Sequence, residues 1–378
     1  MRTLVLLLLV GVAAAGLAPL YEVDENVKGS YIIKFKDDLD VDITADDIQR
    51  RVQRQRFGRA SFSRRYHNVL TGVVAELSEE ALQYVRTLDE VEYVSEDGIA
   101  YATAIPWGLD RIGQRSSSLD NKYSPDSKYR SGRGVEIWVL DTGVRFSHND
   151  FGGRASFGYD AFGDDGSDCN GHGTHCAGIA AGSTYGVAKK ATIKAGRVLG
   201  CSGSGSYSGI IGALDHVKAN ANKPAVVSMS LGGSRSTSLD NAVNSVISAG
   251  ISVVVAAGND NANACNTSPA RVDKAVTVGS SDKYDRRSSF SNYGSCVDIF
   301  APGSSIPSAY YTSNSATKTL SGTSMACPHV SGIAALYLAE SSGRSPATIM
   351  NKLKSAATSN ALSSVGSGSP NLLAYVDQ

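Results

Sequence analysis

Three residues that are far apart in the chain have the side chains that nucleophilic acyl transfer requires. Ser324 lies in Gly322-Thr323-Ser324-Met325-Ala326, where a turn of small residues precedes an apolar run that predicts a helix to residue 338. Glycine permits a tight turn and a close approach of substrate. The first N–H groups of the helix can hold a developing negative charge. This placement suits a nucleophile, although serine is also a common helix N-cap.

The second candidate, Asp141, follows an apolar run over residues 135–140 that predicts a buried strand. An aspartate at the C-terminal end of a parallel strand lies where α/β folds place their sites. An Asx turn that closes the strand is the commoner use of Asp-Thr-Gly. The triplet also occurs in aspartic proteases, which need two carboxylates that share a proton. The sequence contains no second Asp-Thr-Gly or Asp-Ser-Gly, which argues against that class.

The third candidate, His172, lies between Gly171 and Gly173, just before an apolar run that predicts a helix over residues 174–181. Histidine titrates near neutral pH, so it can take a hydroxyl proton and return it. His172 and His175 also have the spacing of a metal-binding pair. No third ligand follows them, and the sequence has no His-Glu-x-x-His motif, so a zinc site is the weaker interpretation.

The order of these residues, Asp then His then Ser, separates three classes of serine hydrolase. α/β-Hydrolases have the order Ser, Asp, His, chymotrypsin has His, Asp, Ser, and subtilisin has the order seen here. At this point the chain resembles the subtilisin-like serine proteases and, within them, the secreted proteinase K-like branch. The resemblance extends over motifs at residues 106–109, 139–143, 171–176, 230–233, 256–259, 284–294, 322–328 and 371–375.

The resemblance implies a role for each candidate. His172 would take the proton of Ser324 as the hydroxyl attacks a peptide carbonyl, and Asp141 would hold the imidazole in the required tautomer. The oxyanion would bind the backbone N–H of Ser324 and the side-chain amide of Asn259. Taken alone, Asn259 is an ordinary turn asparagine.

The resemblance also implies a groove that pairs with the main chain of a polypeptide substrate, which favours broad specificity. Small residues beside it would leave an apolar primary pocket open for an aromatic or aliphatic residue. By composition alone, the stretch at 203–206 is only a flexible loop. The implied groove and pocket residues are Gly203, Ser204, Gly205, Tyr207, Ser230, Leu231, Gly232, Ala256, Ala257 and Gly258.

Six cysteines allow fifteen disulfide connectivities. Cysteines of secreted proteins are expected to pair. The resemblance implies the pairs Cys169–Cys201 and Cys265–Cys296, each of which would contribute about 3 kcal/mol in the chain-entropy model. Cys176 and Cys327 have the character of small buried core residues with free thiols. A third bridge between them stays open.

A structural calcium ion is a further implication of the resemblance, because oxygen-only ligands suit calcium. The implied ligands are the main-chain carbonyls of Asp273 and Ala275 and the carboxylate of Asp298. A second family site near residues 110–114 has glycine where some relatives have aspartate. Asn266 begins a glycosylation sequon that Pro269 closely follows.

The N-terminal third of the chain differs from the rest. Arg2 precedes an apolar run over residues 4–15, which is shorter than the roughly 18 residues that span a bilayer and predicts a signal peptide at 1–15. Residues 16–101 predict a small α+β unit with strands at 31–35, 69–77 and 91–94 and a helix at 78–88. The arginines between residues 50 and 65 predict a solvated helix face and loop. This unit is similar to the ferredoxin-like propeptides of the family, which assist folding and inhibit until they are cut away, here after Tyr101.

Residues 102–378 alternate between strand and helix patterns. Strands are predicted at 193–199, 225–230, 251–257, 275–278 and 297–300, and helices at 208–219, 238–249 and 324–338. This pattern predicts a doubly wound α/β domain with a parallel sheet.

Composition agrees with a folded globular protein: the 378 residues are 42% hydrophobic and 19% charged. The net charge of +0 indicates neither nucleic acid nor an acidic membrane as a partner. We therefore expect a secreted, monomeric endopeptidase that acts on polypeptides and has its own propeptide as inhibitor. Two other classes stay open: an inactive relative that binds peptides, and a processing enzyme of narrow specificity.

Overall fold

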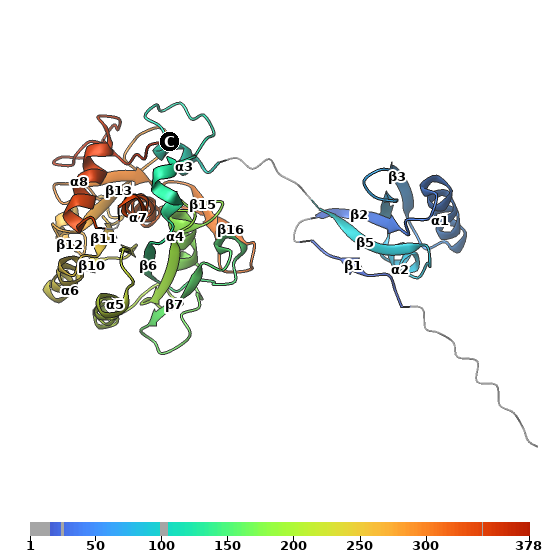
Figure 1. Ribbon diagram of the computed structural model, residues 1–378, viewed down its shortest axis with the longest axis horizontal. Coiled ribbons are helices and arrows are strands. Elements are labelled where there is room, and N and C mark those ends of the chain that lie inside the picture. The colour runs from blue at the N-terminus through green and yellow to red at the C-terminus, as the bar shows by residue number, and fades with distance from the viewer. Residues whose placement is uncertain (1–15, 24–25, 99–104, 342) are drawn as a thin grey trace, which may run out of the picture. The chain divides into compact units, whose positions relative to one another are not determined.

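The computed structural model describes residues 16–23, 26–98, 105–341 and 343–378, and the chain divides into two compact units, Met1–Thr103 and Ala104–Gln378 (Figure 1). The expected signal peptide at 1–15 and the expected cut after Tyr101 lie outside the described residues. Within the described ranges, no helix combines the length and the apolar character that crossing a bilayer requires.

The first unit is an α+β fold with one mixed sheet in the order β1-β5-β2-β4-β3. Its central strand β2 pairs antiparallel with both β4 and β5, and α1 and α2 contribute buried residues to the same core as the sheet. Ser78 caps α2 as expected, because its side chain accepts a hydrogen bond from the N–H of Ala81. The elements are β1 Leu20–Tyr21, β2 Asn26–Phe35, α1 Val41–Gln55, β3 Ala60–Tyr66, β4 Gly72–Leu77, α2 Glu79–Val85 and β5 Val91–Gly98.

One prediction for this unit is wrong. The second part of the arginine-rich segment is not a loop but the edge strand β3, which pairs with β4. The strand was hidden because its apolar alternation is short. Ala60 and Phe62 alternate with serines, but two arginines then interrupt the pattern, where the pairing register with β4 shifts. One of its two arginines, Arg65, forms ion pairs with Asp42 and Asp46 on α1.

The second unit contains a nine-stranded sheet in the order β17-β18-β14-β13-β11-β9-β6-β8-β7 within the described residues. Neighbouring strands from β14 to β7 run parallel, which confirms the doubly wound α/β prediction. The strands are β6 Glu136–Asp141, β7 Ala155–Asp160, β8 Thr192–Arg197, β9 Ala225–Met229, β11 Ser252–Ala256, β13 Val276–Ser281, β14 Ile299–Pro302, β17 Thr358–Ser359 and β18 Leu372–Leu373. Two short pairs lie outside this sheet: β10 Gly233–Ser234 with β12 Thr267–Ser268, and β15 Ile306–Ala309 with β16 Thr317–Leu320.

Helices cover both faces of the sheet, and each face has its own core. Ile137 and Val139 of β6 belong to one core together with residues of α4, α7 and α8, while Trp138 and Leu140 belong to the other with residues of α5 and α6. This alternation is expected for a strand that is buried on both sides. The helices are α3 Trp107–Ile112, α4 His172–Ala181, α5 Tyr207–Asn220, α6 Thr237–Ser248, α7 Thr323–Glu340 and α8 Pro346–Ala356.

The strand order places several chain segments at one edge of the sheet. After β6 the chain forms β7 and β8 on one side of it and then β9 on the other side, so the strand order reverses around β6. The segments that follow the C-terminal ends of β6, β8, β9 and β11 therefore converge there, which is where ligands bind in open α/β sheets. Helices α4 and α7 contact each other and belong to the same core on one face of the sheet (Figure 1).

Candidate active site

The aspartate and histidine candidates are in direct contact. Asp141 is the last residue of β6 and is fully buried, and His172 is the first residue of α4. The distance from His172 Nδ1 to Asp141 Oδ1 is 2.7 Å. Because a carboxylate accepts this bond, Nδ1 carries the proton and Nε2 is left as the basic nitrogen.

This contact determines the charge preference of the imidazole. Burial lowers the pKa of His172, but the charge and the hydrogen bond of Asp141 outweigh it, and the net pKa lies well above its ordinary value. Asp141 therefore favours the protonated imidazole that forms when a hydroxyl gives up its proton. This is the electrostatic arrangement that general-base catalysis requires.

Ser324 is the second residue of α7, and the sulfur of Cys176 contacts both its backbone carbonyl and the imidazole of His172. Cys176 Sγ is 3.8 Å from His172 Nδ1 and 3.4 Å from the carbonyl oxygen of Ser324. The Ser324 hydroxyl donates to the carbonyl of Ser230 at 3.3 Å, and the described residues show no hydrogen bond from it to His172. Hydrogen bonds of this kind commonly tighten only when substrate is bound.

Asn259 has the orientation that an oxyanion donor requires. Its Oδ1 accepts hydrogen bonds from the N–H of Thr323 at 2.8 Å and from the hydroxyl of Thr323 at 3.0 Å. Since the oxygen end of the amide is fixed by two donors, the Nδ2 end remains available to a bound group. Asn259 and Ser324 line the same cavity, so both donors can reach one ligand atom there.

Two cavities share the wall formed by residues 230–233. The first, of about 590 Å³, contains Ser324, Asn259, Ala256 and Gly258 in its lining. The second, of about 410 Å³, is lined by His172 together with Gly203, Ser204, Gly205, Tyr207 and the shared wall. The predicted groove residues therefore lie on both sides of the candidate triad.

Ala257 is an exception and corrects the sequence-based expectation. It is fully buried in a separate apolar cluster and does not line the cavity. Its carbonyl accepts a hydrogen bond from Asn292 Nδ2 at 2.9 Å. Ala256 and Gly258 on either side of it do line the cavity.

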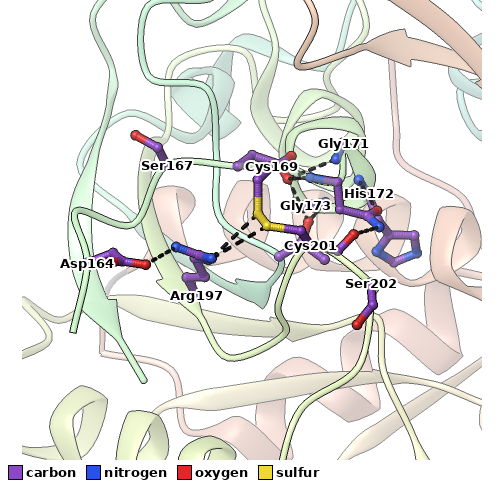
Figure 2. Close-up of a disulfide and its surroundings, with 12 residues drawn as sticks. Asp164, Ser167, Cys169, Gly171, His172, Gly173, Arg197, Cys201 and Ser202 are labelled. Atoms are coloured by element: carbon purple, nitrogen blue, oxygen red, sulfur yellow. Dashed lines mark hydrogen bonds and ion pairs between the residues drawn. A yellow bond between two sulfur atoms is a disulfide. The ribbon is translucent and has the colours of Figure 1, made fainter. Parts of the chain in front are cut away.

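The structure contains the disulfides Cys169–Cys201 and Cys265–Cys296. Figure 2 shows the first bridge beside His172, with Arg197 extending between Asp164 and the sulfur atoms. Cys176 and Cys327 are free and buried. Burial raises the pKa of both thiols, that of Cys327 to about 12, so neither is a reactive thiolate.

The alternative of a His172–His175 metal pair does not fit the geometry. His175 Nε2 lies 3.1 Å from the carbonyl of Ile306 and 2.9 Å from that of Lys318, so this nitrogen donates to two carbonyls. Among the described residues, the one cluster of potential metal-binding side chains is Asp141, His172 and Cys176. That cluster is the candidate catalytic pair with the neighbouring thiol.

The expected calcium ligands lie at the N-terminal ends of β13 and β14, the opposite edge of the sheet from the triad. Asp298 Oδ2 accepts the N–H of Thr277, and Oδ1 contacts the ammonium of Lys354 at 2.9 Å. Burial raises the pKa of Asp298, and the neighbouring Asp273 raises it further. The Asp298 carboxylate with the main-chain carbonyls of Asp273 and Ala275 would be an oxygen-only set, which suits calcium, and Lys354 would be a competing cation.

Sequence reasoning missed the residues that orient the candidate site. Thr142, Asp168 and Asn170 bind the first N–H groups of α4, and Thr323 fixes the amide of Asn259. The sequence does contain a signal for two of them. Asp168 and Asn170 precede His172 by four and two positions, and both residue types commonly cap helix N-termini.

The geometry agrees with comparisons to known proteins. The Subtilase family matches residues 132–371, and the Peptidase inhibitor I9 family matches residues 30–103. Over 381 residues the chain is 46% identical to an extracellular serine proteinase of Thermus sp. (strain Rt41A), which covers 95% of this chain and 92% of that protein. It is 40% identical over 371 residues to a cuticle-degrading protease of Metarhizium anisopliae, covering 95% of this chain and 92% of that one.

A solved structure supports the same assignment. The crystal structure of a cold-adapted subtilisin-like serine proteinase aligns with a TM-score of 0.70 and 54% identity, covering 73% of this chain and 100% of that chain. The chain therefore belongs to the subtilase family, as a serine proteinase of the proteinase K-like branch preceded by an I9 inhibitor-type propeptide.

Proposed function

We propose that this proteinase is a secreted endopeptidase that cleaves polypeptides through a triad of Asp141, His172 and Ser324. The proposal rests on the 2.7 Å contact of Asp141 with His172 Nδ1 and on the Cys176 sulfur, which contacts both this imidazole and the carbonyl oxygen of Ser324. His172 Nε2 takes the hydroxyl proton as Ser324 attacks the scissile carbonyl. It then returns the proton to the leaving amine, which leaves an acyl-enzyme for water to hydrolyse.

The oxyanion of the tetrahedral intermediate binds two donors, the N–H of Ser324 and Nδ2 of Asn259. Within the described residues, the Ser324 N–H has no intramolecular partner, while its neighbour, the Thr323 N–H, is occupied by Asn259. A donor that is held ready in this way stabilises the charge without reorganisation.

Substrate specificity follows from the two cavities. An extended substrate adds its main chain between residues 203–205 and residues 230–232, which tolerates many side chains. Ala256 and Gly258 leave the 590 Å³ cavity open beside Ser324 for an aromatic or aliphatic residue before the cut. Cleavage of a library of peptides by the processed enzyme tests this point, and a single required motif would instead favour a dedicated processing enzyme.

We extend the proposal to the organisation of the precursor. Residues 1–15 direct secretion, residues 16–101 assist folding and inhibit, and the enzyme removes them by its own cut before the peptidase domain at 102–378. The match of residues 30–103 to the I9 inhibitor family supports this division. A structural calcium ion, held by the carbonyls of Asp273 and Ala275 and the carboxylate of Asp298, links the starts of β13 and β14.

Fluorophosphonate labelling tests the central claim, because the reagent modifies only an activated serine. We expect one labelled position in the processed enzyme and none after Ser324→Ala, with a loss of kcat on the order of a million-fold. Ser321→Ala changes an exposed serine of the same turn and should leave labelling intact. Labelling that survives Ser324→Ala would refute the triad, and an intact triad that labels but cuts no peptide would favour a peptide-binding relative.

A further inference from the structure

The turn that precedes α4 is held by a carboxylate outside the triad. Asp168 Oδ1 accepts hydrogen bonds from the hydroxyl of Thr142 at 2.9 Å and from the N–H groups of Asn170 at 3.0 Å and Gly171 at 2.8 Å. Its Oδ2 accepts from the N–H of Thr174 at 2.9 Å and from the hydroxyl of Thr174 at 2.6 Å. Hydrogen bonds to an ionised acceptor are roughly twice as strong as neutral ones, so this carboxylate fixes its surroundings.

The bonds of Asp168 join the two elements that carry the aspartate and the histidine. Thr142 follows Asp141 in the chain, and its N–H donates to Asp141 Oδ1 at 2.7 Å. The Thr142 hydroxyl donates to Asp168 and accepts from the N–H of Gly173 in the first turn of α4 at 2.9 Å. The end of β6 and the start of α4 are thus connected through one hydroxyl and one carboxylate.

The neighbouring disulfide anchors this turn to the substrate groove (Figure 2). Cys169 follows Asp168 in the chain and is bridged to Cys201, and Asn170 Nδ2 donates to the carbonyl of Cys201 at 2.9 Å. Gly171 has φ of +105°, and a Cβ there would lie 2.3 Å from Tyr310. The disulfide and the close contact at Gly171 hold this turn in place. The hydrogen bonds of Asp168 therefore fix the position of the first turn of α4 relative to it.

We propose that Asp168 is a positioning residue for the reaction: through Thr142 and the first turn of α4 it sets the hydrogen bond between Asp141 and His172. The inference rests on the proposed triad. Asp168 touches neither substrate nor the reacting atoms. The other ionisable groups that interact with His172 are Asp141 on β6 and His175 and Cys176 on α4.

Asp168→Asn in the processed enzyme is the first test. The amide keeps one acceptor oxygen but turns an N–H₂ group toward donors, so the turn must rearrange. We expect kcat to fall at least about tenfold with KM changed less than about twofold, because a small misplacement of a catalytic group is costly. We also expect the acid limb of kcat/KM to move down by about half a pH unit, since the contact with Asp141 is what raises the pKa of His172.

Asp165→Asn is the matched control. It removes the same charge from the same loop, where Asp165 Oδ1 accepts the N–H of the exposed Ser167 at 2.9 Å. It should leave both kcat and the acid limb unchanged. An Asp168→Asn enzyme with the parent's kcat and pH profile, or an Asp165→Asn enzyme with the same defects, would overturn the inference.

Thr142 provides a second test, because it is the connection to Asp141. Thr142→Val should reproduce the loss of kcat, Thr142→Ser should restore activity through its hydroxyl, and Thr142→Val combined with Asp168→Asn should lose little more than either change alone. Fully additive losses would show that the two residues act separately, and would refute the proposed connection through Thr142.

A third measurement does not depend on maturation. In the full chain with Ser324→Ala, the imidazole of His172 can be titrated by NMR with and without Asp168→Asn. A lower pKa and a weaker downfield Nδ1–H signal support the inference, and identical titrations overturn it. Failure of the triad itself would be recognised separately, as proteolysis that survives Ser324→Ala.

Discussion

Helices α4 and α7 both begin at a side chain of the proposed triad, yet their first N–H groups have different partners. Each helix has glycine at its N-cap with no side-chain cap from that residue. In α4, the N–H groups of residues 172, 173 and 174 are bound by Asn170, Thr142 and Asp168 in turn. In α7, the N–H groups of residues 323 and 325 are bound by Asn259 and Gly322, and within the described residues that of Ser324 has no protein partner.

The difference matches the two roles that we propose. The base must be held in one orientation, so every early donor of its helix is used to fix it. The nucleophile's helix must keep one donor for the oxyanion. Leaving a buried N–H unpaired costs about 1–3 kcal/mol, and Ser324 is only half-buried beside an open cavity, where water can bind this group until substrate arrives.

The largest expected effect at the α4 end comes from Asp141→Asn, which should lower kcat by about 10⁴-fold because the wrong tautomer of His172 is favoured. Only neutral His172 can act as a base. Its raised pKa therefore predicts that the kcat/KM of the parent falls as pH drops through a midpoint above about 6.5. In Asp141→Asn the midpoint should move down, since burial alone lowers this pKa. Asp215→Asn, an exposed change on α5, is the control for rate and pH measurements between pH 5 and 9.

An acid limb that stays in place in Asp141→Asn would contradict the assignment of His172 as the titrating base. It would also remove the contrast between the two helices, because the fixed start of α4 would then have no catalytic consequence.

At the α7 end, Asn259→Leu should lower kcat by about 10²–10³-fold with little change in KM, since one oxyanion donor is lost. Asn259→Asp refines the test because it keeps an oxygen for Thr323 to bind but replaces the donor with a carboxylate, whose negative charge would repel the oxyanion. If Asn259→Asp loses at least as much kcat as Asn259→Leu, the donor is what matters. If Asn259→Asp retains full kcat, Asn259 acts by holding Thr323 instead. Asn351→Leu on the exposed side of α8 is the control.

Much of the fold could be predicted because its signals are local. The apolar run before Asp141 forms β6, and the expected cap at Ser78 begins α2. Edge strand β3 was missed because its apolar alternation covers only Ala60 to Ser63 and is then interrupted by two arginines. Strand boundaries differ by a few residues, since the strand at 193–199 is observed as β8 Thr192–Arg197, where tertiary pairing determines the end.

The candidate site likewise contains residues that the sequence indicates and residues that only the structure reveals. The three residues of the proposed triad could be singled out because their chemistry is rare in combination and their order is informative. Asp168 and Thr142 could not, because their contact joins residues 26 positions apart and depends on how α4 meets β6. Ala257 was placed in the pocket because residue size was considered without the direction of its side chain.

Each of the two helices also buries a histidine outside the proposed triad, His175 in α4 and His329 in α7, and burial lowers the pKa of each to about 4. An unfolded histidine titrates near 6.5, so the unfolded state takes up protons first. These two histidines therefore leave the free energy of unfolding undiminished above about pH 6.5. They lower it as pH falls toward 4, by on the order of 3 kcal/mol per residue. His172 has the opposite sign because its pKa is raised.

Calorimetry of the full chain with Ser324→Ala between pH 7.5 and 4.5 measures this loss. His329→Gln should flatten the fall in melting temperature across that window. His216→Gln, a partly exposed histidine on α5, should not. Equal pH dependence in all three proteins would show that buried histidines do not control acid stability.

The smallest expected effect concerns the opposite edge of the sheet. Because the proposed calcium ligands lie at the N-terminal ends of β13 and β14, chelation should lower the melting temperature without changing kcat, leaving both helix starts intact. The loss is about 2.7 kcal/mol if calcium is present at one hundred times its Kd. Lys354→Met removes the ammonium that contacts Asp298, so it should tighten calcium binding, whereas Lys352→Met, which breaks a contact with Glu340, should not. If Lys354→Met leaves calcium affinity unchanged, the ion does not share Asp298 with Lys354, and the proposed ligand set must be abandoned.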